Sequence, residues 1–284
     1  MVSMANRLST EKRAQILGCL VEGMSIRAAV RATGAAKNTV SKLLVDVGKA
    51  CGEYLDTLMQ DLPCQRIEAD EIWSYCYAKQ KNIPEEFQDT PGYGDVWTWV
   101  AIDADTKLVP RWLVGERTYE DAEFFIRDVA SRLAHRVQLT TDGLHMYLRA
   151  VQYAFGSDID FAQLRKIYGS PREGQARYSP AVRLGTERLV RSGDPDRRKI
   201  STSYVERQNL TMRMGMRRFT RLTNAFSKKV ENLAAAVALH FAHYNLCRVH
   251  QTLKETPAMA AGFTDHAWTL TELAGLLDTP PVSN

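Results

Sequence analysis

The stretch from Ser201 to Lys229 contains one carboxylate, Glu206, among seven arginines and lysines. A surface that binds polyphosphate would need these cations, and a metal ion bound to the acid would make a carboxylate acceptable beside a negatively charged ligand. Two further acids match it, because Asp70 lies within an apolar, strand-like run and Asp142 ends another. Three such acids predict metal-assisted phosphoryl transfer.

Cutting or joining a phosphodiester requires a nucleophilic oxygen to be activated while the leaving oxygen gains charge. Two divalent ions about 4 Å apart can serve both oxygens. Hard cations such as Mg²⁺ prefer carboxylate oxygens and keep some water ligands, so three acids in one cleft suffice. We therefore expect Asp70, Asp142 and Glu206 to bind two ions and to form the catalytic site.

Each acid also has a structural alternative. Asp70 has Glu68 and Glu71 beside it, and a single acid on an alternating strand often faces solvent. Asp142 precedes a glycine, which is an ordinary turn signal. Glu206 follows Ser203 by three residues, so it could close a capping box and satisfy only a backbone amide.

Helical spacing favours the catalytic interpretation of Glu206. At this spacing Glu206, Asn209, Arg213 and Arg217 share one helix face, with the acid at the head of a phosphate-binding stripe. The capping role and the catalytic role do not exclude each other.

Charge is unevenly distributed along the 284 residues, whose net charge is only +4. Residues 1–50 carry a charge of +5 and residues 163–229 a charge of +12, so the remainder is acidic. Basic zones of this density are typical of nucleic-acid contact, although a solvated surface is the alternative.

The five cysteines have no C-x-x-C spacing, which argues against disulfides and a zinc finger. With no apolar run of 18 residues and no secretion signal, a soluble, cytoplasmic protein without membrane contact is expected.

Residues 9–48 read as three short helices with glycines between them, an arrangement that matches a helix-turn-helix. In that geometry the start of the third helix enters the major groove of DNA. The residues expected there are Lys37, Asn38, Thr39, Ser41 and Lys42. A three-helix bundle with a solvated polar face is the alternative.

The middle of the chain alternates strands and helices. Arg66 to Ala78, Asp95 to Ile102, Leu108 to Val114 and Val137 to Thr141 read as strands, with helices over Thr118 to Ala134 and Leu144 to Phe155. Three strands in a meander, a helix, a strand and a helix give an α/β fold with a ribonuclease H-like (RNase H-like) mixed sheet and flanking helices. An all-α helix-turn-helix domain precedes it.

Three domains follow from these patterns. Residues 1–60 would form the helix-turn-helix domain with a connector helix, and residues 61–262 the RNase H-like catalytic domain. Within the latter, a basic insertion at about 156–200 is rich in glycine, proline and arginine and is expected to have little regular structure. Residues 263–284 would form a C-terminal tail.

The remaining candidate residues favour structural roles. His243 and Tyr244 could contact DNA or activate water, but a packed helix face explains them better. Trp73, Trp97 and Trp99 are expected in the core rather than as base-stacking platforms.

Four ordered motifs resemble the IS1-family insertion-sequence transposases, whose catalytic core is of the DDE type. They are A-D-E-I-W-S-Y, T-T-D-G, S-Y-V-E-R-Q-N with the following R-R-F-T-R-L-T-N-A-F-S-K-K, and H-Y-N-L-C-R-V-H-Q-T-L-K-E-T-P-A, and they cover roughly residues 60–262. The resemblance implies an RNase H-like fold, Mg²⁺ or Mn²⁺, terminal inverted repeats and target DNA as partners, and a homodimer or higher multimer on DNA. By motif match the triad is Asp70, Asp142 and Glu206, and Arg213 falls where related transposases carry a DNA-orienting basic residue.

Two features depart from that family. Better-known members carry a cysteine zinc finger before their helix-turn-helix, and this chain does not; the stretch between the second and third acids is also longer than in compact members. End recognition would then depend on residues 9–48 and the basic segments. The residues expected to contact DNA are Lys37, Asn38, Thr39, Ser41, Lys42, Arg207, Asn209, Arg213, Arg217, Arg218 and Arg221.

The sequence therefore predicts a DNA transposase that binds element ends and catalyses strand cleavage and strand transfer, acting on the nucleoid in the bacterial cytoplasm. Two alternatives stay open. One is an RNase H-like structure-specific nuclease without strand transfer, and the other is a noncatalytic helix-turn-helix regulator.

Overall fold

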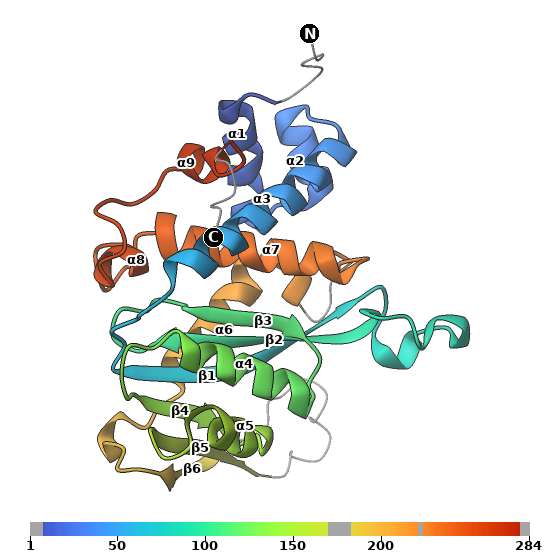
Figure 1. The fold of residues 1–284 in the computed structure, drawn as a ribbon. Coiled ribbons are helices and arrows are strands. Elements are labelled where there is room, and N and C mark those ends of the chain that lie inside the picture. Colours follow the sequence, from blue (N-terminus) through green and yellow to red (C-terminus); the bar gives the residue numbers. More distant parts are fainter. Residues whose placement is uncertain (1–7, 170–182, 221–223, 279–284) are drawn as a thin grey trace.

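A computed structural model describes residues 8–169, 183–220 and 224–278. One six-stranded sheet lies at its centre, in the order β3-β2-β1-β4-β5-β6 (Figure 1). The strands are β1 (Arg66–Cys76), β2 (Gly94–Asp103), β3 (Arg111–Gly115), β4 (Gln138–Asp142), β5 (Asp160–Tyr168) and β6 (Arg183–Ser192). The longer helices are α1 (Thr10–Val21), α2 (Ile26–Thr33), α3 (Lys37–Leu58), α4 (Tyr119–Ser131), α5 (Met146–Phe155), α6 (Ser203–Gly215) and α7 (Val230–Ala242). Two short helices, α8 (Pro257–Ala260) and α9 (Leu270–Gly275), follow a π-helical turn, η5 (His243–Cys247).

The strand directions define an RNase H-like fold. Strands β1, β2 and β3 form an antiparallel meander, whereas β4 pairs parallel to β1 and β5 pairs parallel to β4. Helices α4 and α5 cover one face of the sheet and α6 packs against β1 and β2 on the other (Figure 1). The mixed α/β class predicted from the sequence is confirmed.

The three predicted N-terminal helices are present, and local capping explains where they begin. The hydroxyls of Ser9 and Ser25 accept hydrogen bonds from Lys12 N and Ala28 N at the starts of α1 and α2. Gly34 ends α2 in the left-handed conformation, with φ 71°, which glycine adopts without strain. Helix α3 then continues as the predicted connector.

Helix α3 joins the N-terminal helices to the core by crossing α7 at close range. A Cβ atom added to Gly48 would lie 2.3 Å from the carbonyl oxygen of Ala235, so only glycine allows this crossing. The C-terminal segment also returns to the N-terminal helices, because Arg13 of α1 forms an ion pair with Asp278 and Leu273 of α9 is buried. Helix α9 and the residues after it therefore pack against α1.

The prediction of little regular structure for residues 156–200 is wrong. Strands β5 and β6 occupy most of the described part of this segment and extend the sheet. The inner half of β5 is buried beside β4, including Phe161 and Gln163, while its outer half is exposed. Its apolar residues therefore do not alternate along the whole strand, and the alternation rule did not predict a strand here. Residues 170–182 lie outside the described part.

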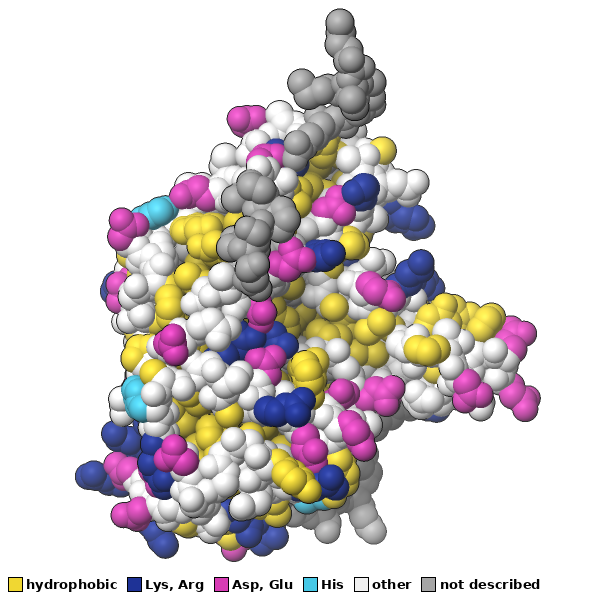
Figure 2. All heavy atoms as spheres, viewed as in Figure 1, with side chains coloured by type: hydrophobic (Ala, Val, Ile, Leu, Met, Phe, Trp, Pro, Cys, Tyr) yellow, Lys and Arg dark blue, Asp and Glu magenta, His cyan; other side chains and the backbone are white. Residues whose placement is uncertain are grey.

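The β1–β2 connection projects from the body of the molecule (Figure 1). Its base is held by an aromatic cluster in which Tyr77 stacks on Tyr93 at 4.3 Å and Phe87 packs edge-on against both rings. Acidic side chains gather at its tip (Figure 2), where Glu85 and Glu86 are exposed.

All five cysteines are free thiols, as expected. No helix in the described residues combines the length and apolarity needed to cross a bilayer.

Candidate active site

The sheet register brings Asp70 and Asp142 together. Pairing between β1 and β4 runs as far as Ala69 opposite Thr141, so the next residues of the two parallel strands are Asp70 and Asp142. Beyond that point no further β1–β4 pair forms, and β4 ends. Two acids far apart in sequence thus stand at adjoining strand positions.

A third carboxylate joins them, and it was not predicted. Ligand oxygens of Asp70, Glu71 and Asp142 lie within 4.8 Å of one another. Glu71 is held in place by Arg117, whose Nε and second guanidinium nitrogen donate to Oε1 at 2.9 and 2.5 Å, and by the Tyr147 hydroxyl at 3.3 Å. The Arg117 guanidinium in turn lies over the Trp97 ring.

Glu206 reaches the cluster from α6. One of its carboxylate oxygens accepts a hydrogen bond from the Thr202 hydroxyl, and the other forms an ion pair with Lys166 of β5. It also raises the pKa of Asp70 and of Asp142, so it lies within electrostatic range of both. Its oxygens do not belong to the close group formed by the other three acids in the described residues.

The capping alternative for Glu206 does not apply. The backbone N–H groups of Tyr204 and Val205 at the start of α6 donate to the Glu68 carboxylate at 2.8 and 3.1 Å. Glu68 therefore satisfies the helix N-terminus, where a negative charge is favourable. Within the described residues, neither Ser203 nor Thr202 accepts a capping hydrogen bond at α6, and Glu206 remains directed toward Lys166.

Asn209 lies one helical turn beyond Glu206 and fixes Asp70. Its Nδ2 donates to Asp70 Oδ2 at 2.9 Å, and its own Oδ1 is buried with no hydrogen-bond partner in the described structure. Glu206, Asn209 and Arg213 all lie on α6, and Arg213 is exposed. Arg217 is not part of this helix, because α6 ends at Gly215 and Met216 is extended, so Arg217 begins a separate 3₁₀ turn, η4 (Arg217–Phe219).

The turn after Asp142 is fixed by a buried amide. Gln163 of β5 donates through Nε2 to the carbonyl oxygens of Asp142 at 2.9 Å and Leu144 at 3.0 Å. Its Oε1 accepts from Arg191 of β6 at 3.1 Å. The side chain of Asp142 itself accepts from Leu144 N at 2.9 Å. The hairpin that the sequence treated as an insertion thus positions one of the candidate ligands.

Burial and mutual repulsion raise the pKa values of the clustered acids. The pKa of Asp70 rises to about 8, first through burial and then through the charges of Glu71 and Asp142. Burial and Asp142 raise the pKa of Glu71 to about 7 against the opposing effect of Arg117. Burial also raises the pKa of Asp142, opposed by its hydrogen bond from Leu144. The site concentrates more negative charge than its neighbouring cations balance.

This donor set fits a hard divalent cation. Carboxylate oxygens within 4.8 Å of one another are ligands that Mg²⁺ and Mn²⁺ prefer, and the orphaned Asn209 Oδ1 shows an unsatisfied acceptor beside them. Bound there, such ions would activate a water or hydroxyl nucleophile and stabilise the leaving oxygen. Asp70 and Asp142 could hold the ions, with Glu206 or Glu71 completing the set.

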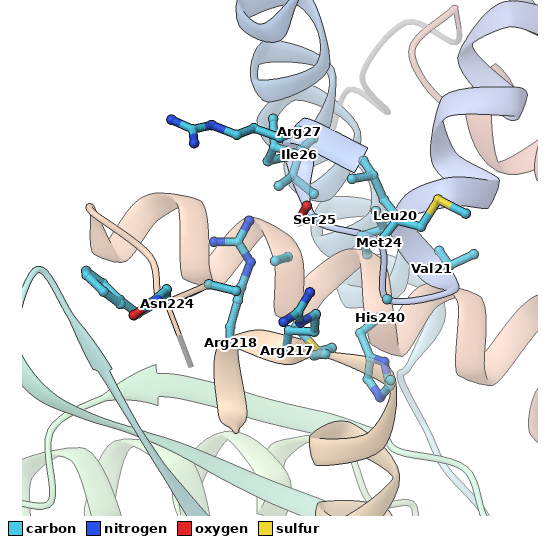
Figure 3. Close-up of a pocket in the computed structure, with 18 of the residues that line it drawn as sticks. Leu20, Val21, Met24, Ser25, Ile26, Arg27, Arg217, Arg218, Asn224 and His240 are labelled. Atoms are coloured by element: carbon cyan, nitrogen blue, oxygen red, sulfur yellow. The ribbon is translucent and has the colours of Figure 1, made fainter. Parts of the chain in front are cut away.

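A second feature lies where the N-terminal helices meet the core. A pocket of about 630 Å³ is lined by the α1–α2 turn, the start of α3, η4 and α7. Figure 3 shows the side chains of Arg217 and Arg218 extending from η4 toward this turn. Arg27 and Lys37 line it from the opposite side, and among the described residues no aspartate or glutamate lines it. The pocket is therefore electropositive.

The other predicted DNA-binding residues differ in accessibility. Lys37, Asn38 and Lys42 are exposed, whereas Thr39 and Ser41 are half-buried. The Lys42 ammonium forms an ion pair with Asp46 at 2.5 Å. The start of α3 is therefore open to solvent.

The basic residues after Glu206 also fall into different environments. Arg207 is exposed on α6. Arg218 is half-buried and donates to Ser227 Oγ at 2.5 Å, and burial lowers its pKa. Arg221 lies outside the described residues.

The late histidines and Tyr244 lie in and after the packed α7–η5 segment. His240 is half-buried and lines the pocket beside η4, and burial lowers its pKa to about 3. The Tyr244 hydroxyl donates to the carbonyl oxygen of Lys107 at 3.0 Å. Trp99 is fully buried against Phe125 and Tyr147, which confirms it as a core residue.

No protein-family model and no curated protein matches the chain. Solved structures with a similar arrangement are transposases. The piggyBac transposase synaptic complex with hairpin DNA is 11% identical over 97% of this chain and 73% of that chain, with a TM-score of 0.40. The Mos1 strand transfer complex is 11% identical over 84% of this chain and 79% of that chain, with a TM-score of 0.25. The pre-cleavage Mos1 transpososome is 9% identical over 86% of this chain and 80% of that chain, with a TM-score of 0.27. Likeness at this level supports no functional argument.

Proposed function

We propose that the chain is a DDE transposase of an insertion sequence, which binds the ends of its element, cuts one strand and joins the freed 3′ hydroxyl to target DNA. The observation that carries the proposal is the meeting of Asp70, in the middle of β1, with Asp142 at the end of β4, with Glu206 arriving from α6. The four sequence motifs that resemble the IS1 family support assignment to that group.

In this proposal Asp70, Asp142 and Glu206 hold two Mg²⁺ or Mn²⁺ ions. Glu206 is a better third ligand than Glu71, because Glu71 is 2% exposed and already accepts three hydrogen bonds, two of them from Arg117. The ion pair of Glu206 involves a flexible lysine at the mouth of the site and can be exchanged for a divalent ion. Asn209 would orient Asp70.

DNA would contact the basic surfaces around this site. The pocket between the N-terminal helices and η4 supplies Arg27, Lys37 and Arg217 for phosphates. The start of α3 would read an inverted-repeat end in the major groove. We propose assembly as a homodimer or higher multimer on DNA, and action on the nucleoid in a bacterial cytoplasm.

The test is a cleavage assay on labelled DNA carrying the inverted repeats that flank the gene, with Mg²⁺, with Mn²⁺ and with a chelator. We expect metal-dependent nicking and joined products, both absent in Asp70→Asn, Asp142→Asn and Glu206→Gln. The matched control is Asp89→Asn, since Asp89 is exposed on the β1–β2 connection away from the cluster. Nicking without joining would instead indicate a nuclease. DNA binding with no cleavage under any metal would indicate a regulator.

A further inference from the structure

A second basic pocket, of about 400 Å³, lies beside α6. Three separate segments line it with basic groups. Lys107 comes from the β2–β3 turn, Arg207 from α6, and Arg248 and His250 from the chain after η5. In the part of the chain that the structure describes, no aspartate or glutamate lines this pocket. Such a set of donors fits an anion.

The Lys107 ammonium donates to the carbonyl oxygens of Ala104 and Asp105, so it contacts backbone oxygens rather than a carboxylate. In the ranges that the structure describes, no carboxylate forms an ion pair with the side chains of Lys107, Arg207 or Arg248. His250 experiences the same excess of positive charge, because Lys107 and Arg248 add to burial in lowering its pKa. Two arginines, each with a planar fork of N–H donors, suit a phosphate better than a point charge would.

The pocket is built on a fixed framework. The Tyr244 hydroxyl bonds the carbonyl of Lys107, and Asn245 exchanges two hydrogen bonds with the backbone of Val109, at 3.0 Å to its N–H and 2.9 Å to its C=O. The Lys107 ammonium lies 3.5 Å from the ring centre of Tyr204. The β2–β3 turn is thus tied to η5 and to α6 on one side of the pocket.

Helix α6 separates this pocket from the acidic cluster. Arg207 and Thr211 line the pocket, whereas Asn209 and Glu206 lie on the side that faces the acids. At 100° per residue these are opposite sides of one helix, which is about 10–12 Å across with its side chains. That width corresponds to about three nucleotides at a rise of about 3.4 Å along one strand.

We propose that this pocket binds a backbone phosphate of the DNA strand that crosses α6 while its scissile phosphodiester lies at the acids. The inference rests on the proposed function for the identity of the ligand. A phosphate held there fixes the register of the strand relative to the cluster and reads no sequence. Arg248 is the most informative residue, since it lines this pocket and lies outside α6.

The experiment measures binding of a fluorescent DNA duplex by anisotropy over a series of salt concentrations without divalent ions. Arg248→Gln should weaken binding about tenfold and reduce the slope of log affinity against log salt by about 0.9, the value for one phosphate contact. Arg248→Lys should keep the wild-type slope. The matched control is Arg127→Gln, an exposed arginine of α4 on the other face of the sheet. Melting temperatures verify folding, and Arg207→Gln replaces Arg248→Gln if the latter is unstable.

The outcomes separate the two proposals. If wild type binds DNA and both glutamine variants keep its slope, the pocket assignment is overturned and the transposase proposal is untouched. If the slope falls as expected but wild type never cuts the inverted-repeat DNA, the pocket stands and the transposase proposal fails. If inorganic phosphate raises the melting temperature of wild type but not of Arg248→Gln while the DNA slope is unchanged, the ligand is a free anion and the DNA assignment is overturned.

Discussion

Replacing Asp70 by asparagine should stabilise the metal-free protein at neutral and alkaline pH. In the folded chain, burial and the charges of Glu71 and Asp142 raise the pKa of Asp70 to about 8, whereas an unfolded aspartate has a pKa of about 3.9. The folded state therefore prefers the protonated acid. Its contribution to stability is fully present below about pH 4 and is lost as the pH rises to about 8.

The size of the effect follows from this window. Over the three pH units from 4 to 7 the loss is about 1.4 kcal/mol per unit, or about 4 kcal/mol for an isolated group. Counterions and water near the half-buried cluster reduce it, so we expect Asp70→Asn to gain about 2 kcal/mol in the free energy of unfolding at pH 7. For a chain of this size that is roughly 4–8 °C in melting temperature. The amide also keeps an acceptor for Asn209.

Thermal unfolding of chelator-treated protein at pH 5, 7 and 8 measures this directly. The advantage of Asp70→Asn over wild type should grow with pH, while Asp89→Asn should stay within about 0.5 kcal/mol of wild type throughout. Adding Mn²⁺ at pH 8 should raise the melting temperature of wild type and leave that of Asp70→Asn almost unchanged. A variant less stable than wild type at pH 8, or an advantage independent of pH, would refute the electrostatic reasoning.

Three other substitutions test the framework around the site, each by chemical denaturation. Gly48→Ala should reduce the free energy of unfolding by about 3 kcal/mol, because its Cβ would meet a backbone oxygen of α7. The control Gly52→Ala, whose Cβ meets only one methyl group at 3.9 Å, should be neutral or gain about 0.5–1 kcal/mol. Equal effects of the two substitutions would disprove the close crossing. Asn245→Ala should cost about 3 kcal/mol, since it leaves two buried backbone groups after the β2–β3 turn unpaired, and a cost below about 1 kcal/mol would contradict that pairing. Glu68→Ala should cost about 2 kcal/mol by removing the acceptor of two N–H groups at the start of α6, and an unchanged stability would show that water replaces it.

Local rules predicted much of the fold from the sequence. The helix starts at Ser9, Ser25 and Thr118 follow from side chains that can accept a backbone hydrogen bond, and all three do so. The meeting of Asp70 and Asp142 could be foreseen because both acids lie on apolar strands that neighbour each other in this topology. These features depend on a few adjacent residues or on strand order.

Features set by tertiary contacts could not be predicted in the same way. Glu71 reaches the cluster because β1 continues beyond Ala69, the last residue that pairs with β4. The residue at which this pairing ends cannot be predicted from the sequence of either strand. Strand β5 is buried over only half its length, so it gave no clean alternation. Arg217 does not continue the helical face of Glu206 and Asn209 because α6 ends at Gly215. A single glycine within a helical pattern is a weak signal for a helix end.

The most direct test of the central claim is an anomalous-difference map from crystals of the protein soaked in Mn²⁺. We predict density about 2.1 Å from carboxylate oxygens of both Asp70 and Asp142, with Glu206 turned from Lys166 toward the same ions. Manganese bound elsewhere while Asp70 and Asp142 stay uncoordinated would contradict the account.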